Sequence, residues 1–194
     1  MRRLGGILLA AALTVFVAGC ATAPPEPTGP VLANWTGPDV PADWALLGRA
    51  AVDTGGRSGT VTVRWKQNDG NYRVDMRAPL GAGAVRIEGN GSHVVVRTSD
   101  GERYEGRSAR TLLSRHTGYD LPVESLAWWV RGVPAPGHNE VILDGRGRPT
   151  ELMQSGWRVS YSSWERVHGY WLPAKLAVER GDIKVRMAVR RWDV

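Results

Sequence analysis

The chain has 194 residues, of which 42% are hydrophobic and 23% are charged, with 25 basic and 19 acidic side chains. This length excludes a large multidomain enzyme, and the mixed composition excludes a chain that is disordered throughout. The formal net charge is +6, and a single cysteine rules out an internal disulfide. We therefore expect one domain with a real hydrophobic core.

The first twenty residues form a targeting segment. Two arginines precede an apolar stretch, which is followed by small residues and a cysteine. This is the pattern of a cleaved signal peptide, and it is too short to be a membrane span. The ending Val17-Ala18-Gly19-Cys20 resembles the lipobox of bacterial lipoproteins, although a cysteine at an ordinary cleavage site is the alternative. We predict a signal peptide over residues 1–19 and a lipidated Cys20 that anchors the chain to a membrane.

Residues 20–40 are predicted to be a flexible tether that carries the lipid. They are rich in proline, glycine and small residues and have no periodic apolar pattern. Ala21 stands where an aspartate would resemble the inner-membrane retention signal of lipoproteins. We therefore expect the protein to be lipid-anchored at the periplasmic face of the outer membrane.

From residue 41 onward, apolar and polar residues alternate with a period of two, which is typical of half-buried antiparallel strands. The clearest runs are residues 60–65 and 72–77, and Asn68-Asp69-Gly70-Asn71 between them predicts a tight hairpin turn. Further alternation occurs at residues 85–87, 94–96, 157–161, 176–178 and 183–189. We expect about ten strands joined by local turns.

Two segments break this alternation and predict short helices. One is Ser108 to His116, where Ser108 can cap the first turn, and the other is Val123 to Val130 after Pro122. Because parallel strands need long crossovers, the sheet must be antiparallel. The predicted fold is a mainly β domain over residues 41–194, a curved sheet or incomplete barrel whose apolar face the helices cover. It can hold a cavity if the helices leave space.

Residues that could carry catalysis or bind a metal are scattered along the chain. The four histidines, at 93, 116, 138 and 168, show no metal-ligand spacing, and no Gly-x-Ser-x-Gly motif is present. Residues 81–86 lack the third glycine of a dinucleotide-binding loop. Glu124 and Glu140 could form a carboxylate pair, but a solvated position is the better interpretation for each. We expect no metal, no cofactor and no enzymatic activity.

Basic side chains lie on the polar side of several strands. The mature chain loses Arg2 and Arg3, which leaves a net charge of +4. A solvated sheet face is the default interpretation of the strand arginines at positions 64, 73, 77 and 86. A basic domain in the periplasm has anionic lipid or an acidic partner within reach, and we expect no nucleic-acid partner.

Two apolar features suit lipid handling better than catalysis. Leu80 lies in the Pro/Gly-rich connection 78–83, where it either folds onto the core or forms an exposed tip. A second set of apolar residues on the helices and strands either forms plain core or lines an adaptable pocket, since methionine fills irregular space. We predict that this cavity lining comprises Trp65, Met76, Leu112, Leu126, Trp129 and Met153.

These motifs together resemble the LolB family of outer-membrane lipoprotein receptors. The resemblance covers the mature domain in order, through the lipobox, residues 44–52 (WALLGRAAV), 59–67 with Trp65, Pro79-Leu80-Gly81, 121–126 (LPVESL), 156–161 (GWRVSY) and Leu172-Pro173. Trp164 departs from the tyrosine expected there, and residues 130–150 match only loosely.

The resemblance implies an antiparallel, unclosed β-barrel with short helices covering an apolar cavity, as in the periplasmic carrier LolA. It implies a monomer that receives acylated lipoproteins from a LolA-type carrier and inserts them into the inner leaflet of the outer membrane, with Leu80 at the tip of the membrane-insertion loop. The rival interpretation is a structural outer-membrane lipoprotein that binds a protein partner through a surface and has a filled core. A third interpretation is a hydrolase that modifies lipids.

Overall fold

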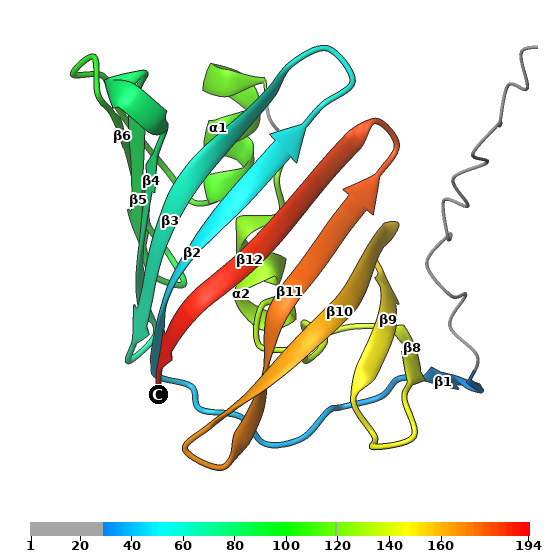
Figure 1. The fold of residues 1–194 in the computed structure, drawn as a ribbon. Helices are drawn as coiled ribbons and strands as arrows, with labels where there is room; N and C mark the ends of the chain where they lie inside the picture. The colour runs from blue at the N-terminus through cyan, green and yellow to red at the C-terminus, as the bar shows by residue number, and fades with distance from the viewer. Residues whose placement is uncertain (1–28, 119) are drawn as a thin grey trace, which may run out of the picture.

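The computed structural model describes residues 29–118 and 120–194, so the predicted signal peptide, Cys20 and the first part of the tether lie outside the described residues. The described residues form one antiparallel sheet that bends around two helices lying against one of its faces (Figure 1). The strands are β1 (Val31–Ala33), β2 (Trp44–Asp53), β3 (Ser58–Asn68), β4 (Asn71–Arg77), β5 (Ala84–Gly89), β6 (Val94–Thr98), β7 (Arg103–Gly106), β8 (Glu140–Leu143), β9 (Pro149–Gln154), β10 (Trp157–Val167), β11 (Tyr170–Arg180) and β12 (Ile183–Asp193). The helices are α1 (Ala109–Thr117) and α2 (Val123–Trp129).

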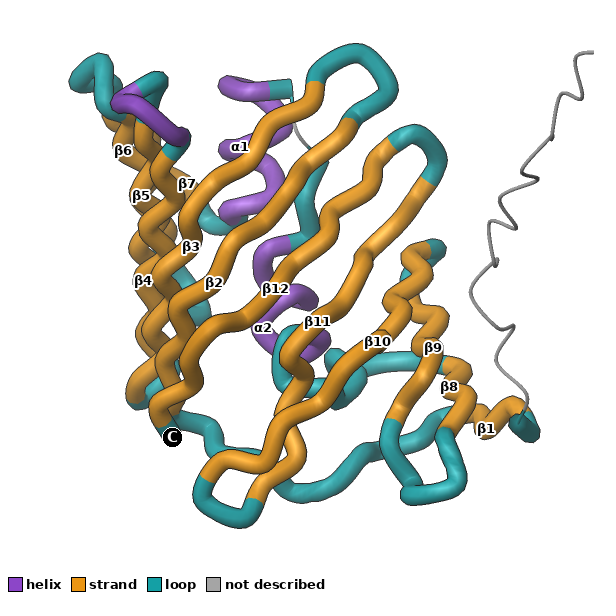
Figure 2. The backbone as a smooth tube through the Cα atoms, in the orientation of Figure 1, coloured by secondary structure: helices purple, strands orange, loops and turns teal. Residues whose placement is uncertain are grey.

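The strands follow the order β1-β8-β9-β10-β11-β12-β2-β3-β4-β5-β6-β7 across the sheet. Most neighbours are joined by hairpins. The two helices lie in the long connection from β7 to β8, and residues 34–43 run from β1 at the edge of the sheet to β2 (Figure 2). Strands β1 and β7 form the two open edges, so the barrel is unclosed. The predicted mainly β, antiparallel architecture is confirmed.

Alternation along each strand separates an inner face from an outer face. In β2, Trp44, Leu46, Gly48 and Ala50 are buried, and the residues of β3 opposite Leu46 and Gly48, which are Trp65 and Val63, are buried as well. A register shift between Val189 and Arg191 in β12 keeps this pattern to the end of the chain. The helices cover the inner face, and polar side chains line the outer face.

The helix boundaries follow from local capping. The Ser108 hydroxyl accepts a hydrogen bond from the Thr111 N–H at 3.3 Å, and Gly118 ends α1 in a left-handed conformation. Glu124 in α2 accepts a hydrogen bond from the Ala109 N–H at 2.8 Å, so the second helix helps to cap the first. Both predicted helices are present, and their ends agree to within one residue.

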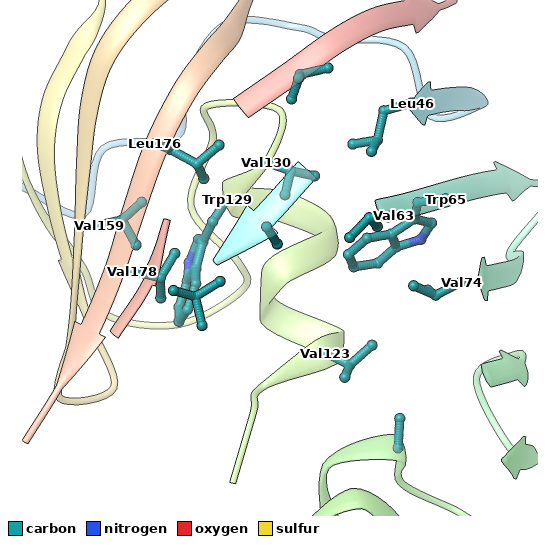
Figure 3. Packing of buried hydrophobic residues seen from close by; sticks show 14 of the residues in the cluster. Leu46, Val63, Trp65, Val74, Val123, Trp129, Val130, Val159, Leu176 and Val178 are labelled. Atoms are coloured by element: carbon teal, nitrogen blue, oxygen red, sulfur yellow. The ribbon is translucent and has the colours of Figure 1, made fainter. Parts of the chain in front are cut away.

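The packed core lies mainly beneath α2. Trp129 from this helix lies beside Val159, Leu176 and Val178 of the sheet (Figure 3). Its indole N–H donates to the buried Gln154 side chain at 2.8 Å, and the Tyr161 hydroxyl donates to the Trp129 carbonyl at 2.9 Å. These hydrogen bonds satisfy polar groups that would otherwise be costly to bury, so they fix α2 on the sheet.

The predicted tether contains one element that the sequence did not reveal. Val31–Ala33 form β1, which pairs with β8 at the edge of the sheet. Three residues are too few to show a periodicity of two, and the surrounding prolines and glycines mask them. Among the described residues, no helix is both long enough and apolar enough to cross a bilayer.

Candidate functional site

An apolar cavity of about 490 Å³ lies between the inner face of the sheet and α1. This volume is within the range of ~300–1,000 Å³ that is common for ligand sites. The cavity sits at the end of the sheet that carries the β4–β5 connection. Its lining includes Val52, Val61, Met76, Val85, Leu113 and Leu121, together with Gly59, Ala82, Gly83 and Ala84.

The cavity follows from the strand pattern and from the small residues beside it. Val52, Val61, Met76 and Val85 come from the four neighbouring strands β2 to β5, and Met76 is opposite Val85 in the register. Gly59 is opposite Val52, and a Cβ atom at Gly59 would meet nothing within 4 Å. The sheet is therefore underfilled at this end, whereas aromatic side chains fill it beneath α2.

The connection between β4 and β5 is a tight loop over residues 78–83. The Ala78 N–H donates to the Gly83 carbonyl at 2.9 Å, and the Ala82 N–H donates to the Pro79 carbonyl at 3.1 Å. Ala78, Ala82 and Gly83 line the cavity. One short loop thus forms both a wall of the cavity and an outward tip.

Leu80 forms that tip. Its side chain is fully exposed, with a relative accessibility of 105%, and its backbone is left-handed at φ 54°. An L-residue other than glycine, asparagine or aspartate rarely adopts this conformation. The structure therefore resolves the sequence alternative in favour of an exposed Leu80, and its role at a membrane remains a proposal.

The predicted lining residues are distributed over the cavity, the core and the outer face. Met76 lines the cavity. Trp65, Leu112 and Trp129 are buried in the packed core, and Leu126 is half-buried against it. None of these four side chains is among the residues that line the cavity, so the prediction fails for them.

The prediction for Met153 is wrong. Met153 lies in β9 with 37% of its surface exposed, whereas the adjacent Leu152 is 1% exposed. Side chains alternate between the two faces of a strand, so the register that directs Leu152 and Gln154 inward directs Met153 outward. The Gly/Pro-rich sequence before β9 gave no independent signal for this register.

Five apolar lining residues larger than alanine were missing from the predicted set, namely Val52, Val61, Val85, Leu113 and Leu121. Val52, Val61 and Val85 are partly buried and belong to recognisable alternating runs. What distinguishes them from core valines is their position near the loop end of the strands. Proximity to Leu80 along the strands was the signal that could have identified them.

An ionic bridge connects the helical layer to the sheet at this end. Asp120, in the connection between α1 and α2, accepts hydrogen bonds from Arg110 of α1 and from Arg180 of β11. Hydrogen bonding to Arg110 is the largest cause that lowers the pKa of Asp120 to about 2, and Arg180 adds to it. The carboxylate is therefore charged at neutral pH and fastens the helices to the sheet.

The two glutamates considered from sequence do not form a pair. Glu124 caps α1, whereas Glu140 lies on the exposed side of β8. Burial, together with the negative charge of Glu124, raises the pKa of Tyr72 to about 12, so this phenol stays neutral. Within the described residues, no group of three histidine, cysteine or acidic side chains could hold a metal ion.

A family model described as "Outer membrane lipoprotein LolB" matches residues 42–192. The chain belongs to the LolB family. A protein named "Outer-membrane lipoprotein LolB" from Alkalilimnicola ehrlichii is 38% identical over 200 residues, covering 100% of this chain and 99% of that protein. A protein of the same name from Halorhodospira halophila is 40% identical over 152 residues, covering 77% of this chain and 75% of that protein. The resemblance stated from sequence is confirmed.

Solved structures show the same fold at low sequence identity. A LolA superfamily protein from Nitrosomonas europaea aligns with a TM-score of 0.54 at 11% identity, covering 80% of this chain and 87% of that one. A DUF1329 family protein from Desulfovibrio piger aligns with a TM-score of 0.55 at 11% identity, covering 79% and 86%. The unclosed antiparallel barrel with its helical cover is therefore shared with the LolA superfamily.

Proposed function

We propose that this LolB-family protein receives acylated lipoproteins from a LolA-type periplasmic carrier and inserts them into the inner leaflet of the outer membrane. Membership of the LolB family and the LolA-superfamily fold support a role in lipoprotein trafficking. The observation that carries the proposal is the loop of residues 78–83. It forms a wall of the apolar cavity while it exposes Leu80.

The cavity offers a place for acyl chains away from water. Each buried methylene group gains roughly 0.8 kcal/mol, so a receptor that shields acyl chains better than the carrier draws the cargo across. Transfer is then passive and needs no covalent step. Burial of the acyl chains in the bilayer completes it, because the hydrocarbon core shields more of their surface than the cavity does.

The exposed loop gives this transfer a direction. Leu80 can enter the headgroup region of the membrane at low cost, because its side chain is already exposed. Ala82 and Gly83 connect the tip to the cavity wall, so contact of Leu80 with lipid brings the cavity close to the bilayer. The lipid on Cys20, with two or more acyl chains, holds the protein stably at the membrane meanwhile.

Transfer can be measured in two stages with the chain from Ala21 onward, which keeps all the strands and helices described. Carrier loaded with an acylated lipoprotein is mixed with this chain, and pull-down shows which protein holds the cargo. Liposomes are then added, and flotation shows whether the cargo enters them. We expect Leu80→Glu to accept cargo but to deliver at least tenfold less of it, because a charge at the tip opposes entry into lipid.

Met153→Glu is the matched control, since it places the same charge at an exposed apolar residue far from the loop. It should deliver cargo normally. Equal delivery by Leu80→Glu and the parent would contradict the insertion role. Retention of the cargo by the carrier in the first stage would favour the rival structural lipoprotein with no lipid site, and the apolar cavity is the observation that speaks against that rival.

A further inference from the structure

A row of arginines crosses the outer face of the sheet, on the side opposite the cavity. Direct cross-strand partners connect Arg191, Leu47, Arg64, Asp75, Arg86, Arg97 and Arg103 through seven consecutive strands from β12 to β7. At a strand spacing of about 4.8 Å, the row is roughly 29 Å long. Within this row, Arg97 has Arg86 and Arg103 directly opposite it, and like charges in such positions destabilise a sheet unless acidic neighbours neutralise them.

One half of this row is neutralised within the protein, and the other half is not. Asp75 pairs with Arg86, Glu88 with Arg97, and Glu105 with Arg103. The outer face of β12, β2 and β3 differs, because among the described residues no carboxylate lies within ion-pair distance of its arginines or of Lys66. These unpaired cations are Arg49, Arg64, Lys66, Arg186, Arg190 and Arg191. We call them the basic face.

The fold concentrates this charge with a bulge. The register shift in β12 inserts Arg190 between Val189 and Arg191, so that two adjacent arginines are both exposed. A bulge redirects side chains in this way without ending the strand pairing. A groove of about 500 Å³ lies around Leu47, and its lining has four basic side chains, Arg64, Lys66, Arg73 and Arg191, against two acidic ones, Asp75 and Asp193. It is large enough for a phosphodiester headgroup.

We propose that the basic face binds anionic phospholipid headgroups and lays the sheet against the membrane surface. Diffuse attraction between basic side chains and anionic lipid needs no apolar anchor, whereas the centre of a protein interface usually has one. No large apolar side chain among the described residues is exposed on this face; Leu47 is half-buried. The outer face also continues to the membrane loop, because Arg77 ends β4 directly before residues 78–83.

This inference goes beyond cargo transfer and does not depend on it. It concerns the headgroups of the membrane, while the cavity and Leu80 concern acyl chains. The protein without cargo should therefore bind anionic headgroups, and loss of the transfer function would leave this binding unchanged. The two proposals can therefore fail separately.

The test is cosedimentation of the chain from Ala21 onward with vesicles of phosphatidylcholine, alone or mixed with phosphatidylglycerol. We expect binding to rise with phosphatidylglycerol at about 0.1 M salt and to fall steeply towards about 1 M salt. The combined change Arg64→Gln and Arg191→Gln should weaken partitioning onto the anionic vesicles roughly 30-fold, and should leave binding to neutral vesicles unchanged.

The matched control is Arg146→Gln with Arg166→Gln, which removes two exposed and unpaired arginines from other parts of the surface. It should bind as the parent does, and circular dichroism should show that both variants fold. Equal weakening by the two variants would overturn the proposal, since net charge alone would then explain binding. So would parental binding by the Arg64 and Arg191 variant, or a response to an acidic protein but not to anionic vesicles.

Discussion

Leu80 combines an exposed apolar side chain with a backbone conformation that a glycine would adopt more easily. The left-handed region costs an ordinary L-residue about 1–2 kcal/mol. Leucine at φ 54° therefore lowers the stability of the loop, at a position where its side chain is fully exposed. Strain of this kind is common at functional sites.

Replacing Leu80 with glycine should separate stability from function. We expect Leu80→Gly to raise the free energy of unfolding by up to about 1 kcal/mol, because it relieves the backbone, and to lower cargo insertion into liposomes. Urea unfolding and the flotation assay measure the two quantities. A glycine variant that inserts cargo normally would show that the loop backbone acts without the leucine side chain.

The adjacent residues Leu152 and Met153 provide a test of the strand register. Leu152→Ala should cost about 2–5 kcal/mol of unfolding free energy, because it leaves a cavity in a packed core. Met153→Ala should change it by less than about 1 kcal/mol, because a third of that side chain is already exposed. Denaturant titration of both variants measures the difference, and similar losses would contradict the orientation of β9.

Individual residues were predictable where their neighbours constrain them. Proline and glycine on both sides of Leu80 indicated a loop, and the family resemblance indicated exposure. The prediction for Met153 was wrong because a single apolar residue does not indicate which face of a strand it lies on unless the strand around it is recognised. Trp65 and Trp129 were predicted to line the cavity but lie in the packed core, because sequence does not reveal whether a large buried side chain faces a space or fills it.

The connection between α1 and α2 is fastened at one carboxylate. Asp120 is bridged by Arg110 and Arg180, which belong to α1 and β11. Its pKa is about 2 in the folded protein, below the usual value of 3.8. A lowered pKa means that the folded state favours the charged form, so the stabilisation is fully present above about pH 4 and is lost as the pH falls towards 2.

Asp120→Asn should therefore destabilise the protein by about 1 kcal/mol at pH 7, a value reduced to allow for solvent screening of this partly exposed carboxylate. The difference between variant and parent should shrink as the pH falls through this window. Urea unfolding at neutral pH and at about pH 3 measures it. A difference that is equal at both pH values would show that the asparagine acts through packing and not through charge.

Elements whose ends are indicated by capping or turn residues were predictable from sequence, and elements without such residues were not. Ser108 and Pro122 defined the starts of both helices, and Asp69-Gly70 defined the β3–β4 hairpin. Strands β8 and β9 were missed because their residues lie among glycines and prolines, and β1 has only three residues. These edge strands are defined by pairing partners distant in the chain, such as Val31 with Ile142, which no local pattern contains.

The inner face of the single sheet has two parts, a packed core and an open cavity. Beneath α2, Trp129, Trp157 and Tyr161 fill the inner face, while beneath α1 the same face is left open as a cavity. The filled part supplies stability, so the open part can remain underpacked at small cost. This division also explains why sequence indicated the fold but not the lining, since both parts share one alternation of apolar residues.

Two valines on the same face of β3 test this division. Val61 lines the cavity, whereas Val63, two residues further along, is 3% exposed in the core. Val61→Phe should occupy the cavity, leave the unfolding free energy within about 1 kcal/mol of the parent, and reduce saturable binding of an apolar fluorescent dye severalfold. Val63→Phe should cost about 1–3 kcal/mol through overpacking, yet bind the dye while folded. Fluorescence titration and denaturant unfolding of both variants give these quantities, and unchanged dye binding by Val61→Phe would place the ligand outside the cavity.

Because both changes add the same side chain to the same strand and face, a difference between them can arise only from the space that each one enters.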